Sequence, residues 1–206
     1  MSMDIDILMQ RLFELYPEAA TDSFIDPFFS LISTVMSHRT RDDVTYPAAS
    51  RLFERFSTPE KMIKADVSEI ETLIKDVGFY RVKAERIQEI SGLLLEKYDG
   101  RVPDNMEALL ELPGVGRKTA NCVLAHAFLK DALAVDTHVH RISNRLGLVA
   151  TKAPEETEAE LKKIFPQKDW RYINLLLVKL GQNACRPISP RCKTCVLEDI
   201  CPKILL

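Results

Sequence analysis

Glycine and long apolar runs are both scarce in this chain. Only 7 of its 206 residues are glycine, and no apolar run is long enough to cross a membrane, so we expect no membrane partner. No repeat or low-complexity tract is present. Apolar residues recur at helical spacing along most of the chain, and no convincing alternating strand interrupts them. The sequence therefore predicts an all-α fold.

A strong net charge is also missing. The chain carries a formal charge of −2 with a pI near 6.1, which by itself disfavours a nucleic-acid partner. The distribution of charge matters more than its sum. Residues 112–152 contain six Lys or Arg against two Asp, with three His besides. This segment is either a basic binding surface or an ordinary solvated helix face.

A secretory signal is the third absence. The first residues, Met-Ser-Met-Asp-Ile-Asp, lack a basic start and an apolar core. We therefore expect a cytoplasmic protein. Because thiols stay reduced in that compartment, clustered cysteines indicate metal binding rather than disulfides.

Four of the five cysteines lie close together near the C-terminus, with the spacing C-x6-C-x2-C-x5-C: Cys185, Cys192, Cys195 and Cys201. Structural four-cysteine zinc sites usually combine two short pairs, and only the middle two residues form one here. A loop around one larger centre suits this spacing better. The spacing favours a [4Fe–4S] cluster, with zinc as the alternative. Cys122, among apolar neighbours, is expected to be a buried small residue.

Helix signals punctuate the chain. Asp26-Pro27 is a predicted N-cap followed by proline at the first helical position. Residues 66–69 resemble a capping box, and residues 104–107 are expected to cap the helix that runs to Leu112. Further helices are predicted from Arg117 to about Lys130 and, capped by Asp136, over 137–146.

The sequence Leu-Pro-Gly-Val-Gly at 112–116 joins two of these helices by a very short turn. Gly114 and Gly116 can adopt positive φ, and together with Val115 and Arg117 they let another backbone approach the start of the next helix. Helix N-termini bind anions such as phosphate. The turn resembles a helix-hairpin-helix, a module that grips the DNA backbone without reading bases. A plain helix–helix turn is the alternative.

Lys118 and Asp136 are the candidate catalytic residues. A cation in the first turn of a helix opposes the helix dipole, so beside Arg117 some neutral amine is expected at Lys118. Neutral lysine forms Schiff bases; the alternative is a phosphate-binding lysine. Asp136 either caps its helix or stabilises positive charge on a sugar whose base departs, and it can do both.

Taken in order, residues 112–120, residues 134–145 (Ala-Val-Asp-Thr-His-Val-His-Arg-Ile-Ser-Asn-Arg) and the four-cysteine loop resemble the helix-hairpin-helix DNA glycosylases, and most closely their cluster-bearing endonuclease III branch. The resemblance covers essentially the whole chain. It implies two helical lobes flanking a DNA-binding cleft. One is a six-helix barrel with the hairpin, at residues 21–130. The other is a discontinuous domain of residues 1–20 and 131–206 that holds the [4Fe–4S] cluster.

The resemblance also implies an activity. It makes Lys118 the Schiff-base lysine, Asp136 the catalytic aspartate and the four clustered cysteines the cluster ligands. The implied enzyme is a bifunctional glycosylase in base-excision repair. It removes oxidised pyrimidines and cuts the strand 3′ to the abasic site by β-elimination. The partner would be double-stranded DNA with a damaged base or an abasic site, bound by a monomer in the cytoplasm or nucleoid.

Two loops of this family fill the hole that a flipped base leaves in the duplex. One matches residues 37–40, where this chain has His38 and Arg39 in place of the glutamine common in endonuclease III. The other matches residues 78–80, where Phe79 is the expected wedge, a core aromatic being the alternative. Three other functions stay open: a mismatch glycosylase for uracil or thymine opposite guanine, a non-catalytic cluster-bearing DNA-binding protein, and an electron carrier.

Overall fold

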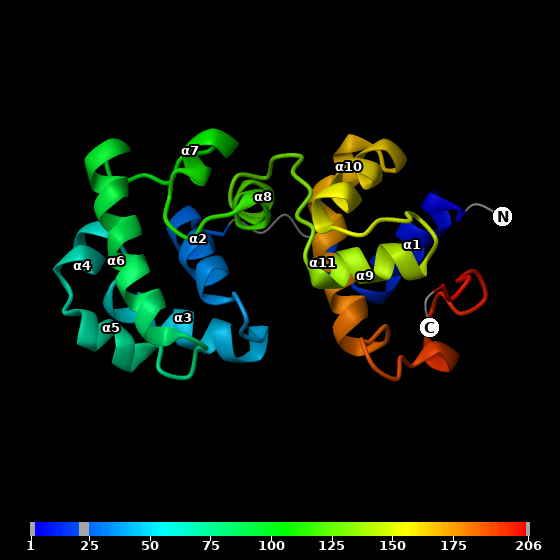
Figure 1. Cartoon of the computed structure of the whole chain (residues 1–206), viewed down its shortest axis with the longest axis horizontal. Coiled ribbons are helices and arrows are strands. Elements are labelled where there is room, and N and C mark those ends of the chain that lie inside the picture. The colour runs from blue at the N-terminus through cyan, green and yellow to red at the C-terminus, as the bar shows by residue number, and fades with distance from the viewer. Residues whose placement is uncertain (1–2, 21–24, 205–206) are drawn as a thin grey trace. The chain divides into compact units, whose positions relative to one another are not determined.

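This computed structural model describes residues 3–20 and 25–204, and every regular element among them is helical (Figure 1). The predicted all-α fold is confirmed. The chain divides into two compact units, one formed by Met1–Ser23 with Leu129–Leu206 and the other by Phe24–Phe128. The domain boundary expected at residue 21 lies outside the described residues.

The continuous unit is built around one apolar helix. Nearly every side chain of α2 is half-buried or buried, and α2 packs against α3, α6 and α8 (Figure 1). The long α6 also packs against α4 and α5. The bounds are α2 Pro27–Met36, α3 Asp42–Arg55, α4 Pro59–Lys64, α5 Val67–Leu73, α6 Tyr80–Lys97, α7 Met106–Leu110 and α8 Arg117–His126.

Side chains near the helix starts explain where several of these helices begin. Asp26 Oδ1 accepts a hydrogen bond of 2.9 Å from the amide of Phe29, as its sequence predicts. Asn105 Oδ1 caps α7 in the same way, 2.9 Å from the amide of Ala108. The predicted capping box was wrong: Asp66 is the N-cap of α5 by position, but among the described residues its side chain makes no cap hydrogen bond. The last turn of α8 also ends earlier than predicted, at His126.

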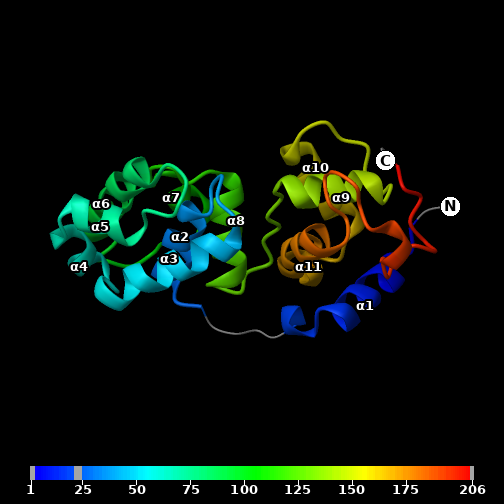
Figure 2. The ribbon, with the colours of Figure 1, turned by 90° about the horizontal axis from the view of Figure 1, so that it is seen from below.

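The discontinuous unit forms a second core. Its helices are α1 Ile5–Leu15, α9 Thr137–Arg145, α10 Pro154–Ile164 and α11 Trp170–Asn183, with short 3₁₀ turns η1 Pro17–Ala20, η2 Gln167–Asp169 and η3 Cys192–Thr194. α9 and α11 lie side by side (Figure 2). A Cβ at Gly181 would lie 2.3 Å from His138 Nδ1, so glycine permits this close approach. The core between them includes Ile142, Leu177 and Leu180.

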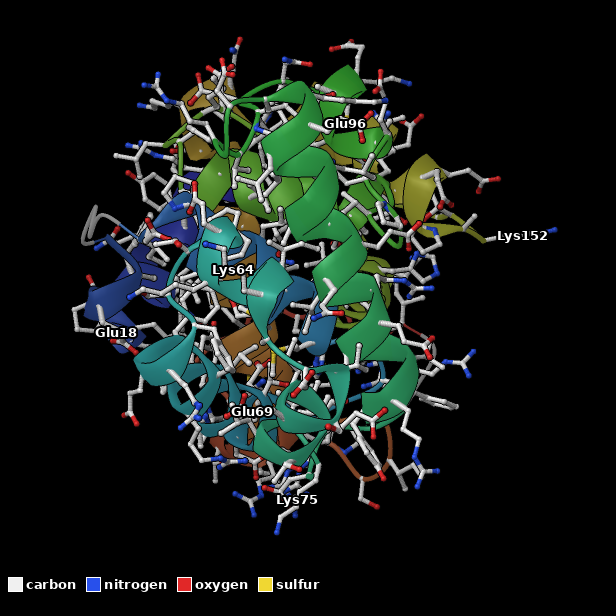
Figure 3. All side chains as sticks on the ribbon, turned by 90° about the vertical axis from the view of Figure 1, so that its left-hand side faces the viewer. Glu18, Lys64, Glu69, Lys75, Glu96 and Lys152 are labelled. Carbon is white, nitrogen blue, oxygen red and sulfur yellow. The ribbon has the colours of Figure 1, made fainter. Side chains whose placement is uncertain are left out.

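The surfaces of both units carry mixed charge. In Figure 3 the labelled Lys64, Lys75 and Glu96 point away from the ribbon of the continuous unit, and all three side chains are exposed. Within the described part of the chain, no helix combines the length and the apolar character needed to span a membrane.

Candidate functional site

The turn before α8 has two glycines with different conformations. Gly114 has φ +73°, and a Cβ there would lie 2.3 Å from Cδ of Arg86. Gly116 has φ −96°, so it does not use the positive φ that a glycine could adopt at this position. A Cβ on Gly116 would meet nothing within 4 Å. Gly114 therefore makes the turn possible, while Gly116 leaves open space at the N-cap of α8. Arg86, which the sequence did not single out, places a cation against this turn.

Val115 holds the turn to its own core. Its side chain is buried, and its amide donates a 3.1 Å hydrogen bond to the carbonyl of Leu112. Any contribution of Val115 to binding would therefore come from its backbone. Arg117, the first residue of α8, is exposed.

Lys118 lies half-buried in the first turn of α8. The residue after it, Thr119, is buried, and its Oγ1 lies 2.9 Å from Nε2 of His38. Burial lowers the pKa of His38 below its usual value, and the positive charges of Lys118, Lys83 and Arg86 lower it further. His38 is therefore neutral near pH 7, and it joins the loop at 37–40 to the helix that carries the candidate nucleophile.

Arg39 and Phe79, from the two predicted wedge loops, lie together. The guanidinium carbon of Arg39 is 5.7 Å from the ring centroid of Phe79. Phe79 is 63% exposed, which argues against the core alternative. Both residues have positive φ, 53° and 58°, a conformation uncommon for residues other than glycine. The amide of Gly78 donates to Oγ1 of Thr40 at 3.1 Å, so the two loops are joined directly.

Lys83 is a residue that the sequence reasoning missed. Its side chain is only 4% exposed, and its ammonium donates to the carbonyls of Met36 at 2.7 Å and His38 at 2.6 Å, and to Oγ1 of Thr40 at 3.1 Å. Burial lowers its pKa to about 8, with a further contribution from Arg86. A signal was present, because Lys83 lies one helical turn before the buried Ile87 on the apolar stripe of α6.

Asp136 caps α9 as predicted. Its Oδ1 accepts hydrogen bonds from the amides of His138 and Val139, both at 2.8 Å. The side chain is half-buried in the discontinuous unit. Asp136 therefore has the predicted role of helix cap, and one oxygen of its carboxylate provides it.

Two arginines of α9 hold the start of the cysteine loop. Arg141 donates to the carbonyl of Cys185 at 2.9 Å. Arg145, only 8% exposed, donates to the carbonyls of Arg186 at 2.6 Å and Pro187 at 2.9 Å. Its guanidinium also lies 3.6 Å from Sγ of Cys185. These bonds fix the first thiol relative to α9, the helix that Asp136 caps.

The four clustered thiols line a single pocket. The space free of protein atoms there is about 420 Å³, including the part open to solvent, and Ile142, Leu146, Leu180 and Leu197 form much of its apolar wall. Burial raises the pKa of Cys195 and of Cys201, and repulsion from neighbouring thiolates adds to both. In residues 3–20 and 25–204, no three His, Cys, Asp or Glu side chains converge to hold a single metal ion. The donor set and the apolar wall fit a larger centre bound by thiolates.

A family model describes most of this arrangement. Residues 32–167 match the model of the HhH-GPD superfamily of base excision DNA repair proteins. The chain belongs to this family. It is 53% identical over 197 residues to endonuclease III of Thermotoga maritima, covering 96% of this chain and 92% of that protein. The predicted endonuclease III resemblance is confirmed, and with it the enzyme class, a base-excision DNA glycosylase and lyase.

Solved structures agree with this assignment. A trapped covalent intermediate of endonuclease III with DNA matches with a TM-score of 0.88 and 37% identity, covering 97% of this chain and 94% of that one. A thermostable thymine-DNA glycosylase matches with a TM-score of 0.81 and 27% identity, covering 96% and 95%.

Proposed function

We propose that this chain removes oxidised pyrimidines from double-stranded DNA and then cleaves the strand 3′ to the abasic site, with Lys118 as the nucleophile. The observation that carries this proposal is the position of Lys118 in the first turn of α8, two residues after the open Gly116. A DNA backbone approaching this turn would meet the N-terminus of α8 and the cations of Arg86 and Arg117. We also propose that the protein acts as a monomer on nucleoid DNA.

The proposed chemistry uses the side chains of Lys118 and Asp136. The base is flipped out of the duplex, and the neutral amine of Lys118 attacks C1′ of the sugar. The C1′–N bond breaks, and the base leaves with the electron pair and takes up a proton. Asp136 stabilises the positive charge that develops on the sugar. The sugar ring then opens: the C1′–O4′ bond breaks, O4′ takes up a proton, and an iminium forms between C1′ and the lysine nitrogen. Loss of the C2′ proton from this iminium expels the 3′ phosphate, and hydrolysis of the imine frees the lysine.

The cysteine pocket supports the proposal of a [4Fe–4S] cluster on Cys185, Cys192, Cys195 and Cys201. When bound, the cluster would cross-link the C-terminal loop, and no step of the excision reaction depends on it. Arg186, Arg191 and Lys193 lie beside these ligands in the sequence. We propose that they present cations to DNA phosphates.

A panel of single-lesion duplexes tests the substrate class. Wild-type protein should release thymine glycol and 5-hydroxycytosine faster than thymine or uracil opposite guanine. The reverse order would favour the mismatch alternative, which the likeness to a thymine-DNA glycosylase keeps worth testing.

The variant Asp136→Asn separates the two roles of this residue. Asparagine caps a helix about as well as aspartate, so the melting temperature should stay within a few degrees. Base release should fall by about 100-fold, because the charge is gone. Unchanged base release would leave Asp136 with its structural role alone.

A further inference from the structure

We infer that Lys83 is a positioning residue that holds residues 36–40, here called the reading segment, in the conformation that presents His38 and Arg39. The inference rests on the proposed function for the meaning of that conformation, since the family resemblance implies that the loops of Arg39 and Phe79 fill the hole that a flipped base leaves in the duplex. The contacts themselves all lie within the continuous unit.

The ammonium of Lys83 ties the reading segment to α6 at three points. Its acceptors are spaced along the segment: the carbonyl of Met36 at 2.7 Å, the carbonyl of His38 at 2.6 Å and Oγ1 of Thr40 at 3.1 Å. Because an ammonium has three N–H donors, this geometry uses all of them. Bonds from a charged donor in a buried site are stronger than ordinary ones, so one side chain fixes both ends and the middle of the segment.

Two of these contacts lead on to proposed functional groups. His38, held by its carbonyl, places Nε2 2.9 Å from Oγ1 of Thr119, next to Lys118 in sequence. Thr40 is held by its hydroxyl, whose oxygen also accepts a hydrogen bond of 3.1 Å from the amide of Gly78. Gly78 directly precedes Phe79. Lys83 therefore sets the segment against the helix of the nucleophile and against the second wedge loop.

The backbone is strained at Arg39, between two of these anchors, and at Phe79, next to Gly78. Arg39 has φ +53° and Phe79 has φ +58°, and residues other than glycine keep such angles only where surrounding contacts impose them. A Cβ at Gly78 would also lie 3.2 Å from the carbonyl oxygen of Arg39, so the two loops are close. Removing the ammonium should let both residues relax and separate the guanidinium of Arg39 from the ring of Phe79.

Hydrogen exchange of the whole protein tests this directly. Lys83→Met keeps an unbranched side chain of similar shape, without the terminal nitrogen, and removes its donors. Peptides covering 36–41 and 78–80 should exchange about tenfold faster, while peptides of α11 should not change. The matched control is Lys97→Met on the same helix, whose exposed ammonium pairs with Glu111 at 3.2 Å; it should leave both peptides unchanged. Equal exchange in Lys83→Met and wild type would overturn the inference.

A second variant covers the case in which Lys83→Met fails to fold. Thr40→Val keeps the shape of residue 40 and removes the oxygen that joins Lys83 to Gly78. It should speed exchange of 78–80 more than that of α2. Exchange as slow as in wild type at residues 78–80 would count against the inference in the same way.

A functional readout then separates positioning from general stability. Trapping is measured under single-turnover conditions on abasic duplexes that differ in the base opposite the abasic site. Lys83→Met should reduce the ratio of the trapping rates on two such duplexes. Adding Arg39→Ala to Lys83→Met should change that ratio little further. Full additivity of the two substitutions would contradict the inference. If wild type forms no adduct, the proposed function fails, and the exchange result still decides the role of Lys83.

Discussion

The guanidinium of Arg39 lies over the ring of Phe79, 5.7 Å from its centroid. The two residues are 40 positions apart in the chain and come from separate loops, and each has a left-handed backbone conformation. A cation over an aromatic face is a favourable contact. Here it holds the guanidinium of Arg39, which suits hydrogen bonding to a base edge, beside the ring of Phe79, which suits a gap between stacked bases. We propose that the pair fills the space that an extruded nucleotide leaves.

Phe79→Ala should slow excision on the order of tenfold on a paired lesion, because the apolar wedge that offsets lost stacking is removed. Excision from single-stranded DNA, which has no stack to refill, should change much less. Val82→Ala is the control, since Val82 is 50% exposed on the same helix. The comparison is single-turnover excision on the two substrates, and an equal loss on both would contradict the wedge role.

Gly114 and Gly116 should separate stability from binding. Gly114→Ala forces a Cβ into the left-handed region and against Arg86, so unfolding free energy should fall by about 1–2 kcal/mol. Gly116→Ala has an allowed φ and open space, so stability should change by less than about 0.5 kcal/mol.

The open space at Gly116 is also where a DNA backbone would approach. Gly116→Ala should therefore weaken duplex binding, measured by fluorescence anisotropy, although the protein stays as stable as wild type. Unchanged affinity would place the phosphate contact elsewhere.

The starts of several helices could be predicted from sequence patterns, because local interactions determine them. Proline and an acceptor side chain start α2, and the short glycine turn starts α8. Other features depended on tertiary contacts. The carbonyls that accept from Lys83 come from residues 45 and 47 positions away. Asp66 is the opposite case, because residues 66–69 match a local motif, the capping box, and yet the side chain of Asp66 makes no cap hydrogen bond among the described residues.

His38 should make stability depend on pH. Its pKa is lowered in the folded state, so the unfolded chain binds more protons between that value and about 6.5. The contribution of His38 to stability is therefore full above pH 6.5 and is lost as the pH falls through the folded-state pKa. His38→Gln removes this titration, so its melting temperature should fall less between pH 7 and pH 5 than that of wild type. Parallel curves would show that His38 is not the group responsible.

Cys195→Ala should abolish the broad visible absorbance expected of a [4Fe–4S] cluster and lower the iron content of protein purified without oxygen. The control is Cys122→Ala, because Cys122 is buried in the continuous unit and does not line the cysteine pocket. It should keep both signals. Zinc in place of iron in the wild-type protein would contradict the proposed cofactor.

Borohydride trapping tests the central claim most directly, using a duplex with one thymine glycol and three proteins: wild type, Lys118→Ala and Lys118→Arg. Arginine keeps the positive charge but forms no imine. Wild type should give a covalent adduct, and neither variant should, while Lys118→Arg still binds the duplex. An adduct at the wild-type level from Lys118→Arg would show that the nucleophile is another group and that Lys118 serves DNA phosphate alone.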